Sequence, residues 1–217
     1  MTTDFEAWVG FIFDRDVSDP EWFWSPEFDT RWQALEITPA VTVPYLTRLY
    51  QEPAVLARFS LEQIAQGIWF LVGESSPAQP SHALLDAAIP LQDRLDCVKA
   101  IASFFRDFVA GAAPGSADTE TNPFHIACYM WWDIFPTWGG GKAAEPELDQ
   151  ACLEVMAEVL AIPSELCQLS ALHGLNHWYL NCAEDVERIV DAFVAGANDL
   201  SARVREYAAL ARRGLAQ

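Results

Sequence analysis

The sequence predicts an all-α fold on the strength of three observations. In most of the chain, apolar residues recur at steps of three and four, which is the period of a helix. Residues that favour helix starts, such as Ser60, precede these segments, and glycine or proline follows them. No segment has the sustained alternation of apolar and polar residues expected of a half-buried strand. We therefore expect about eight helices in this chain of 217 residues.

The clearest element is a helical hairpin that begins at Ser164, a residue suited to an N-cap. We expect its first helix to run to about Leu180, a turn at Asn181 and Cys182, and a second helix that Gly196 stops. This stretch is similar to a HEAT or armadillo-type repeat, whose unit is two antiparallel amphipathic helices. The resemblance implies a short, irregular stack of helices and no particular activity.

The remaining helices are predicted from their caps and apolar stripes. Residues 1–36 give no single prediction, because 8–13 fit a strand or a helix and 19–29 fit a loop or broken turns. The helices expected beyond this segment cover residues 39–52, 61–72, 91–110, 123–135, 146–160 and 199–213.

We expect a single helical domain over residues 1–217. The flexible run Gly139–Gly141 marks a candidate subdivision into an acidic, aromatic half, residues 1–138, and a repeat-like half, residues 146–217. The aromatic residues near the N-terminus are expected either to pack onto the helical body or to form an exposed patch for a basic partner.

The charge of the chain restricts its partners. It has 13 basic and 31 acidic residues, a formal net charge of −18. DNA, RNA and anionic membrane surfaces would be repelled, whereas a basic protein, a cationic ligand or a metal ion is compatible. High solubility is the plainer interpretation of the same charge.

A cytoplasmic location is expected. The N-terminus lacks the basic and apolar regions of a signal peptide. The five cysteines are odd in number, widely spaced and without a CxxC pair, which favours buried, reduced thiols.

His173 and His177 form the one HxxxH pair, and about 40° around a helix separates them, so both rings can face one metal ion. The metalloprotease pattern requires a glutamate after the first histidine, where this chain has Gly174. A metal site would need a carboxylate or thiol from another helix. We therefore expect no stoichiometric zinc and no cofactor, with hydrogen bonds in a polar core as the plainer role of the pair.

The segment NPFHIACYMWWDIFPTW is the second candidate region. His125 and Cys128 could ligate zinc or form a thiol nucleophile pair, although no motif surrounds them. Adjacent tryptophans lie about 100° apart on a helix, so Trp131 and Trp132 either bridge two packing layers or leave one ring exposed. An exposed ring near Asp133 would be a strong contact residue.

The sequence favours a non-enzymatic protein that binds another protein, for example an immunity or antitoxin-like protein with an acidic surface for a basic toxin. Two alternatives stay open: a metal-binding protein or metal-dependent enzyme centred on the histidine pair, and a structural subunit of a homo-oligomer. Nucleotide-binding, hydrolase and EF-hand signatures are absent. The candidate binding residues are Trp131, Trp132, Asp133, Trp138, His125, His173 and His177, with Trp22 and Trp24 as a second group.

Overall fold

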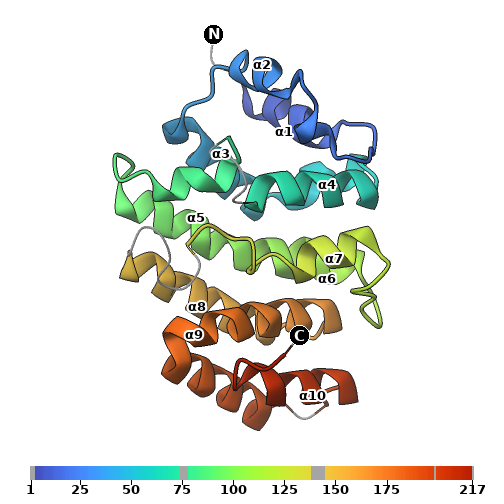
Figure 1. The fold of residues 1–217 in the computed structure, drawn as a ribbon, viewed down its shortest axis with the longest axis vertical. Coiled ribbons are helices and arrows are strands. Elements are labelled where there is room, and N and C mark those ends of the chain that lie inside the picture. The colour runs from blue at the N-terminus through green and yellow to red at the C-terminus, as the bar shows by residue number, and fades with distance from the viewer. Residues whose placement is uncertain (1–2, 74–77, 138–144, 198, 217) are drawn as a thin grey trace.

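The computed structural model describes residues 3–73, 78–137, 145–197 and 199–216, and all regular elements within these ranges are helical. The all-α prediction is thereby confirmed. The helices lie across the long axis of the molecule in successive layers, with α1 and α2 at one end and α10 at the other (Figure 1). The HEAT-like character of this arrangement stays a prediction.

The N-terminal segment forms a helix and short turns. Asp4 caps α1 (Phe5–Phe13) by accepting a hydrogen bond from the Ala7 N–H at 2.8 Å, and Trp8 lies fully buried on this helix. A 3₁₀ turn, η1 (Trp22–Trp24), and the short helix α2 (Phe28–Gln33) follow. The ambiguity at residues 8–13 is thus resolved as helix, and most of the aromatic rings pack onto the body.

The middle of the chain follows its predicted caps. Helix α4 (Leu61–Val72) starts with the capping box of Ser60 and Gln63, in which both reciprocal hydrogen bonds are present. Helix α5 (Leu91–Phe104) continues through a π-helical turn, η4 (Phe105–Val109), into α6 (Ala110–Ala112). The other elements here are α3 (Pro39–Gln51), η2 (Pro53–Arg58) and η3 (Pro80–Leu85).

The predicted helix over residues 123–135 is wrong in its second half. Helix α7 (Pro123–Tyr129) ends after Tyr129, and turns occupy residues 130–137. The N–H groups of Trp131 and Asp133 donate to carbonyls three residues back, which tightens the backbone ahead of Pro136. Both adjacent tryptophans in this turn are fully buried.

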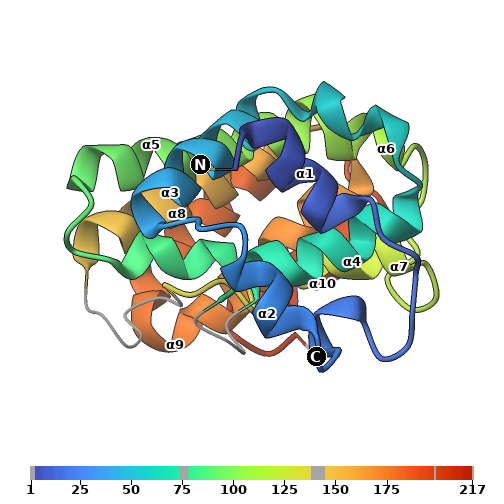
Figure 2. The same ribbon diagram turned by 90° about the horizontal axis from the view of Figure 1, so that it is seen from above.

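The C-terminal part contains the predicted hairpin. Helix α8 (Pro146–Leu160) packs on α5 and on α9 (Glu165–Gly196), and α10 (Ala202–Ala211) packs on α9. Cys182 has non-helical dihedral angles and divides α9 into two arms. Gln168 and Phe193 line one groove, so the arms run antiparallel, as expected. In the view from above, α3 lies nearer the viewer than α8 and α9, which lie deeper in the stack of helices (Figure 2).

One hydrophobic core extends from Phe5 in α1 to Ala211 in α10. The run Gly139–Gly141, which suggested a subdivision, lies outside the described residues. All five cysteines are free thiols, and four of them are buried, as predicted, whereas Cys182 is half-buried. No described helix combines the length and the apolarity needed to cross a bilayer.

Candidate metal centre

Three side chains that could ligate a metal ion converge in the structure. Asp133, His173 and His177 each offer a ligand atom, and these atoms all lie within 4.8 Å of one another. Asp133 Oδ1 is 3.2 Å from His177 Nδ1, and the centroids of the two imidazole rings are 4.5 Å apart. The turn after α7 thus supplies the carboxylate that the sequence alone could not place beside the histidine pair.

Gly174 makes this convergence sterically possible. A Cβ atom at this position would lie 2.4 Å from Trp132 Cβ and 2.8 Å from Met156 Sδ, closer than real Cβ contacts. Because Gly174 has no Cβ atom, α9 can approach the turn that carries Asp133. Gly174, which stands where a metalloprotease has its glutamate, therefore allows Asp133 to approach the two histidines.

Hydrogen bonds from residues on either side of Gly174 also hold α9 against the end of α7 and the turn that follows it. Ser170 Oγ donates to the Cys128 carbonyl at 2.6 Å, and Trp178 Nε1 donates to the Trp132 carbonyl at 3.4 Å. Residues 170, 174 and 178 share one face of the helix because they are four apart. His173 and His177 form the adjacent stripe, which places both rings over the turn.

Buried aromatic contacts hold the turn itself. Trp131 and Trp132 are fully buried, and Trp131 packs against the rings of Tyr50 and Phe104 at 5.7 and 5.4 Å. The interpretation that these tryptophans bridge packing layers is confirmed, and neither is available as a surface contact residue. Trp138 lies outside the described residues.

His173 is held by two tyrosines that the sequence analysis did not single out. Its Nδ1 lies 2.8 Å from the Tyr207 hydroxyl, which lies 2.6 Å from the Tyr129 hydroxyl. The Tyr129 ring stacks on the imidazole with centroids 4.0 Å apart. Tyr129 and Tyr207 are 78 positions apart in the chain, so no local pattern could have indicated this contact.

The second ring nitrogen of His173, Nε2, is buried without a hydrogen-bond partner. Because buried polar atoms are almost always paired, an orphaned ring nitrogen requires an explanation such as a metal ion or a water molecule. Burial, followed by repulsion from His177, lowers the pKa of His173 to about 3. The imidazole is therefore neutral at pH 7, which is the form that binds metals.

The other two candidate ligands remain accessible from solvent. The side chain of His177 is 33% exposed and that of Asp133 is 23% exposed. A metal ion bound here would have three protein ligands and an open side, which is the arrangement of sites that retain a water molecule.

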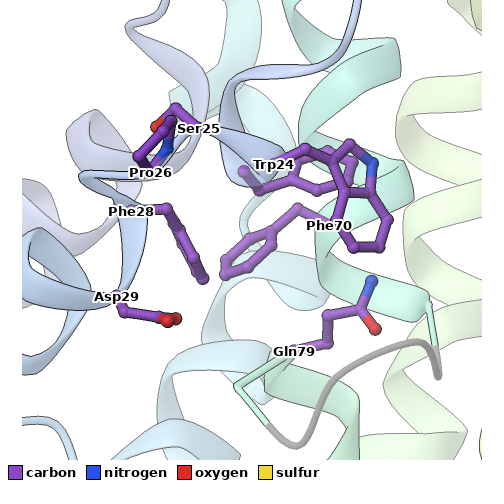
Figure 3. A pocket seen from close by; sticks show the side chains of 8 residues that line it. Trp24, Ser25, Pro26, Phe28, Asp29, Phe70 and Gln79 are labelled. Atoms are coloured by element: carbon purple, nitrogen blue, oxygen red, sulfur yellow. The ribbon is translucent and has the colours of Figure 1, made fainter.

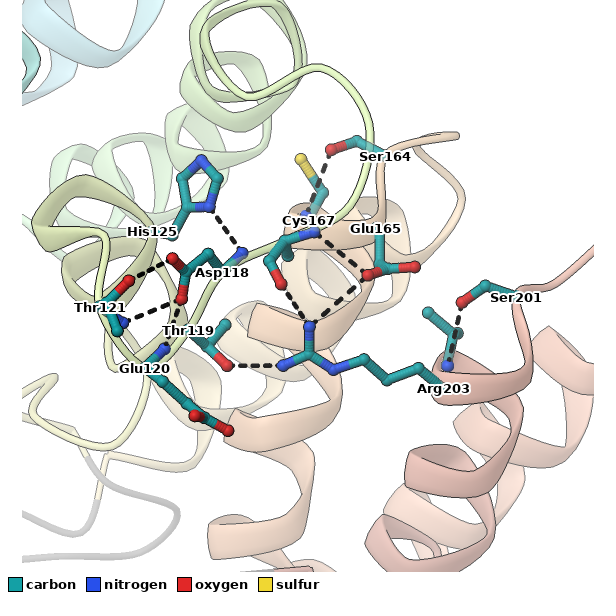
Figure 4. Close-up of polar contacts among 12 residues, drawn as sticks. Asp118, Thr119, Glu120, Thr121, His125, Ser164, Glu165, Cys167, Ser201 and Arg203 are labelled. Atoms are coloured by element: carbon teal, nitrogen blue, oxygen red, sulfur yellow. Dashed lines mark hydrogen bonds and ion pairs between the residues drawn. The ribbon is translucent and has the colours of Figure 1, made fainter.

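Arg203 attaches α10, the helix that also carries Tyr207, to neighbouring segments. Figure 4 shows these contacts of Arg203. Its guanidinium donates to the Ala117 carbonyl and to Thr119 Oγ1, the latter at 2.7 Å, and lies 3.6 Å from a Glu165 oxygen. Arg203 and Tyr207 are four residues apart, so both project from one face of α10. The ion pair and hydrogen bonds thereby orient the tyrosine over His173.

His125 belongs to this neighbouring network and not to the metal centre. Its Nδ1 accepts a hydrogen bond from the Asp118 N–H at 2.9 Å (Figure 4). Cys128 is fully buried, and burial raises its pKa well above the ordinary value of a thiol. The pairing of His125 with Cys128 as a nucleophile is therefore not supported, since the reactive thiolate is disfavoured.

Comparisons with known proteins add no relative from which a role could be transferred. No family model, curated protein or solved structure matches this chain.

Proposed function

We propose that this protein binds a divalent transition metal ion through Asp133, His173 and His177. The observation that carries the proposal is the convergence of the three ligand atoms within 4.8 Å. The buried, unpartnered Nε2 of His173 and the tyrosine bracing of its other nitrogen support it, since metal-bound histidines are oriented through their second nitrogen. The proposal departs from the expectation of no zinc, which rested on the lack of a third histidine and of a glutamate next to His173.

The ligand set indicates which metal ions fit. Two imidazoles and one carboxylate suit Zn²⁺ and also Fe²⁺, the ion of two-histidine, one-carboxylate sites. Soft, thiolate-preferring ions are disfavoured because no cysteine belongs to the described cluster. An ion here would lower the pKa of a bound water molecule, which is the route from metal binding to hydrolytic chemistry.

Metal analysis tests the proposal. Protein stripped with a chelator, incubated with Zn²⁺ and desalted is expected to retain one zinc ion per chain by elemental mass spectrometry. His177→Ala and Asp133→Asn should each lower the affinity strongly, because each removes one of three protein ligands. His125→Ala is the matched control and should retain zinc, since His125 lies in a different network. Retention of zinc by a His173→Ala, His177→Ala double variant would contradict the proposal.

A second candidate function, binding of a basic protein, is favoured by one exposed aromatic residue, Trp24, near the N-terminus. The side chain of Trp24 is 53% exposed, the largest exposure among the described aromatic residues. The net charge of −18 would steer a basic partner toward the molecule and repel nucleic acids. A toxin-neutralising role is one version of this function.

A further inference from the structure

The aromatic cluster of the N-terminal segment contains two neighbouring cavities that share Ser25 and Phe28. We call the first the Arg15 cavity and the second the Trp24 pocket. The Arg15 cavity has a volume of about 340 Å³ and the Trp24 pocket about 300 Å³. Aromatic side chains line both, together with the carboxylates of Asp16 and Glu27 in the first and of Asp29 in the second.

The Arg15 cavity already contains a guanidinium group. The Cζ atom of Arg15 lies 4.1 Å from the Phe11 ring centroid and 5.0 Å from that of Trp22. Its Nε donates to the Phe11 carbonyl at 2.6 Å. These distances are those of cation–π interactions, so the aromatic cluster of this protein accommodates an arginine side chain.

The Trp24 pocket has the same chemistry without such an occupant. Its floor is formed by the Phe28 and Phe70 rings, 5.4 Å apart and nearly perpendicular, and Phe23 lies 5.5 Å from the Trp24 ring. Figure 3 shows the carboxylate of Asp29 and the amide of Gln79 on opposite sides of the opening. Among the described residues, no cation is stacked on the rings of this pocket.

We propose that the Trp24 pocket binds the guanidinium group of an arginine side chain presented by a basic protein, a proposal that rests on the second candidate function. The planar guanidinium stacks on aromatic rings and pairs with a carboxylate such as Asp29 through two hydrogen bonds. Arginine is weakly hydrated compared with lysine, so its transfer to an aromatic pocket costs less. Long-range attraction is also favourable, because residues 1–36 contain nine acidic residues and two arginines.

Titration with N-acetyl-arginine amide, observed through the indole N–H signals of the protein, tests the pocket directly. We expect the Trp24 signal to shift and to saturate at concentrations of roughly 1–100 mM, as suits one partly exposed cation–π contact. N-acetyl-citrulline amide has nearly the same shape without the charge and should leave the signal in place. An equal response to citrulline, or no response to arginine, would overturn the proposal.

Two variants sharpen this titration. Asp29→Asn removes the charge of an exposed side chain and should abolish saturation while leaving the thermal melting curve unchanged. Trp24→Ala should weaken binding of a short oligo-arginine peptide about tenfold. If the peptide binds in a salt-dependent manner but equally well to Trp24→Ala, the pocket is rejected while the broader proposal of a basic partner stands. If the peptide does not bind at all, both proposals fail.

Discussion

At the scale of single residues, Gly174 determines whether the carboxylate of Asp133 can approach the histidine pair of the candidate metal centre. In the sequence it appears only as the loss of a general base, because a glutamate is expected at this place in a metalloprotease. In the structure, the absence of a side chain at Gly174 allows Trp132 and Met156 to contact α9. Asp133, the residue after Trp132, is thereby placed beside the two histidines. The sequence predicted the pair of histidines but not this positive role, since the role depends on contacts from two other segments.

Gly174→Ala is expected to destabilise the protein by about 1–3 kcal/mol, because the added methyl group overlaps the buried Trp132 side chain. The free energy of unfolding from urea titration measures this effect. Gly10→Ala is the matched control: Gly10 lies within α1 and has no atom within 4 Å of the added Cβ, so alanine should be neutral or stabilise by up to about 1 kcal/mol. Equal effects of the two substitutions would refute the steric role of Gly174.

At the scale of elements, predictions were accurate where local signals determine the structure and failed where tertiary contacts do. Ser60 predicted the start of α4 because its capping bonds with Gln63 are local. The end of α7 was misplaced, because Pro136 marks a stop without showing how far back the helix ends. The turn that follows carries two fully buried tryptophans, Trp131 and Trp132.

The sequence predicted that Tyr207 lies on the inner face of the last helix, but not which residue it contacts there. An apolar stripe explains why Tyr207 faces inward, but its bond to His173 follows from how α10 packs on α9. We regard Tyr207 as a positioning residue that fixes the ring orientation and tautomer of His173.

Tyr207→Phe is therefore expected to lower zinc affinity about 10- to 100-fold, the usual effect of removing a hydrogen bond to a metal-bound histidine. Competition with a chromogenic chelator measures the affinity. Tyr45→Phe removes a hydroxyl that bonds to the Thr3 carbonyl, far from the site in sequence and in the fold, and should leave the affinity unchanged. A loss of stability in both variants with unchanged affinity would rule out the positioning role.

At the scale of the whole molecule, one core connects two candidate sites at different places in the stack of helices. The metal centre joins the turn after α7 to α9, with α10 bracing it, whereas the Trp24 pocket lies among η1, α2 and α4. The helical period and the capping residues predicted the all-α class, and the sequence named Asp133, His173 and His177 as separate candidates. It could not predict that they converge, because they come from segments distant in the chain. Substitutions at one site are expected to leave the other unaffected, as distant sites usually behave additively.

A crystal structure of the protein grown with Zn²⁺, with anomalous diffraction recorded on both sides of the zinc absorption edge, tests the central claim most directly. We predict one anomalous peak that lies about 2.0–2.2 Å from an Asp133 oxygen and from one nitrogen each of His173 and His177. We also predict that the Tyr207 hydroxyl remains bonded to the other nitrogen of His173. No peak among these three side chains, or a peak held by other residues, would contradict this claim.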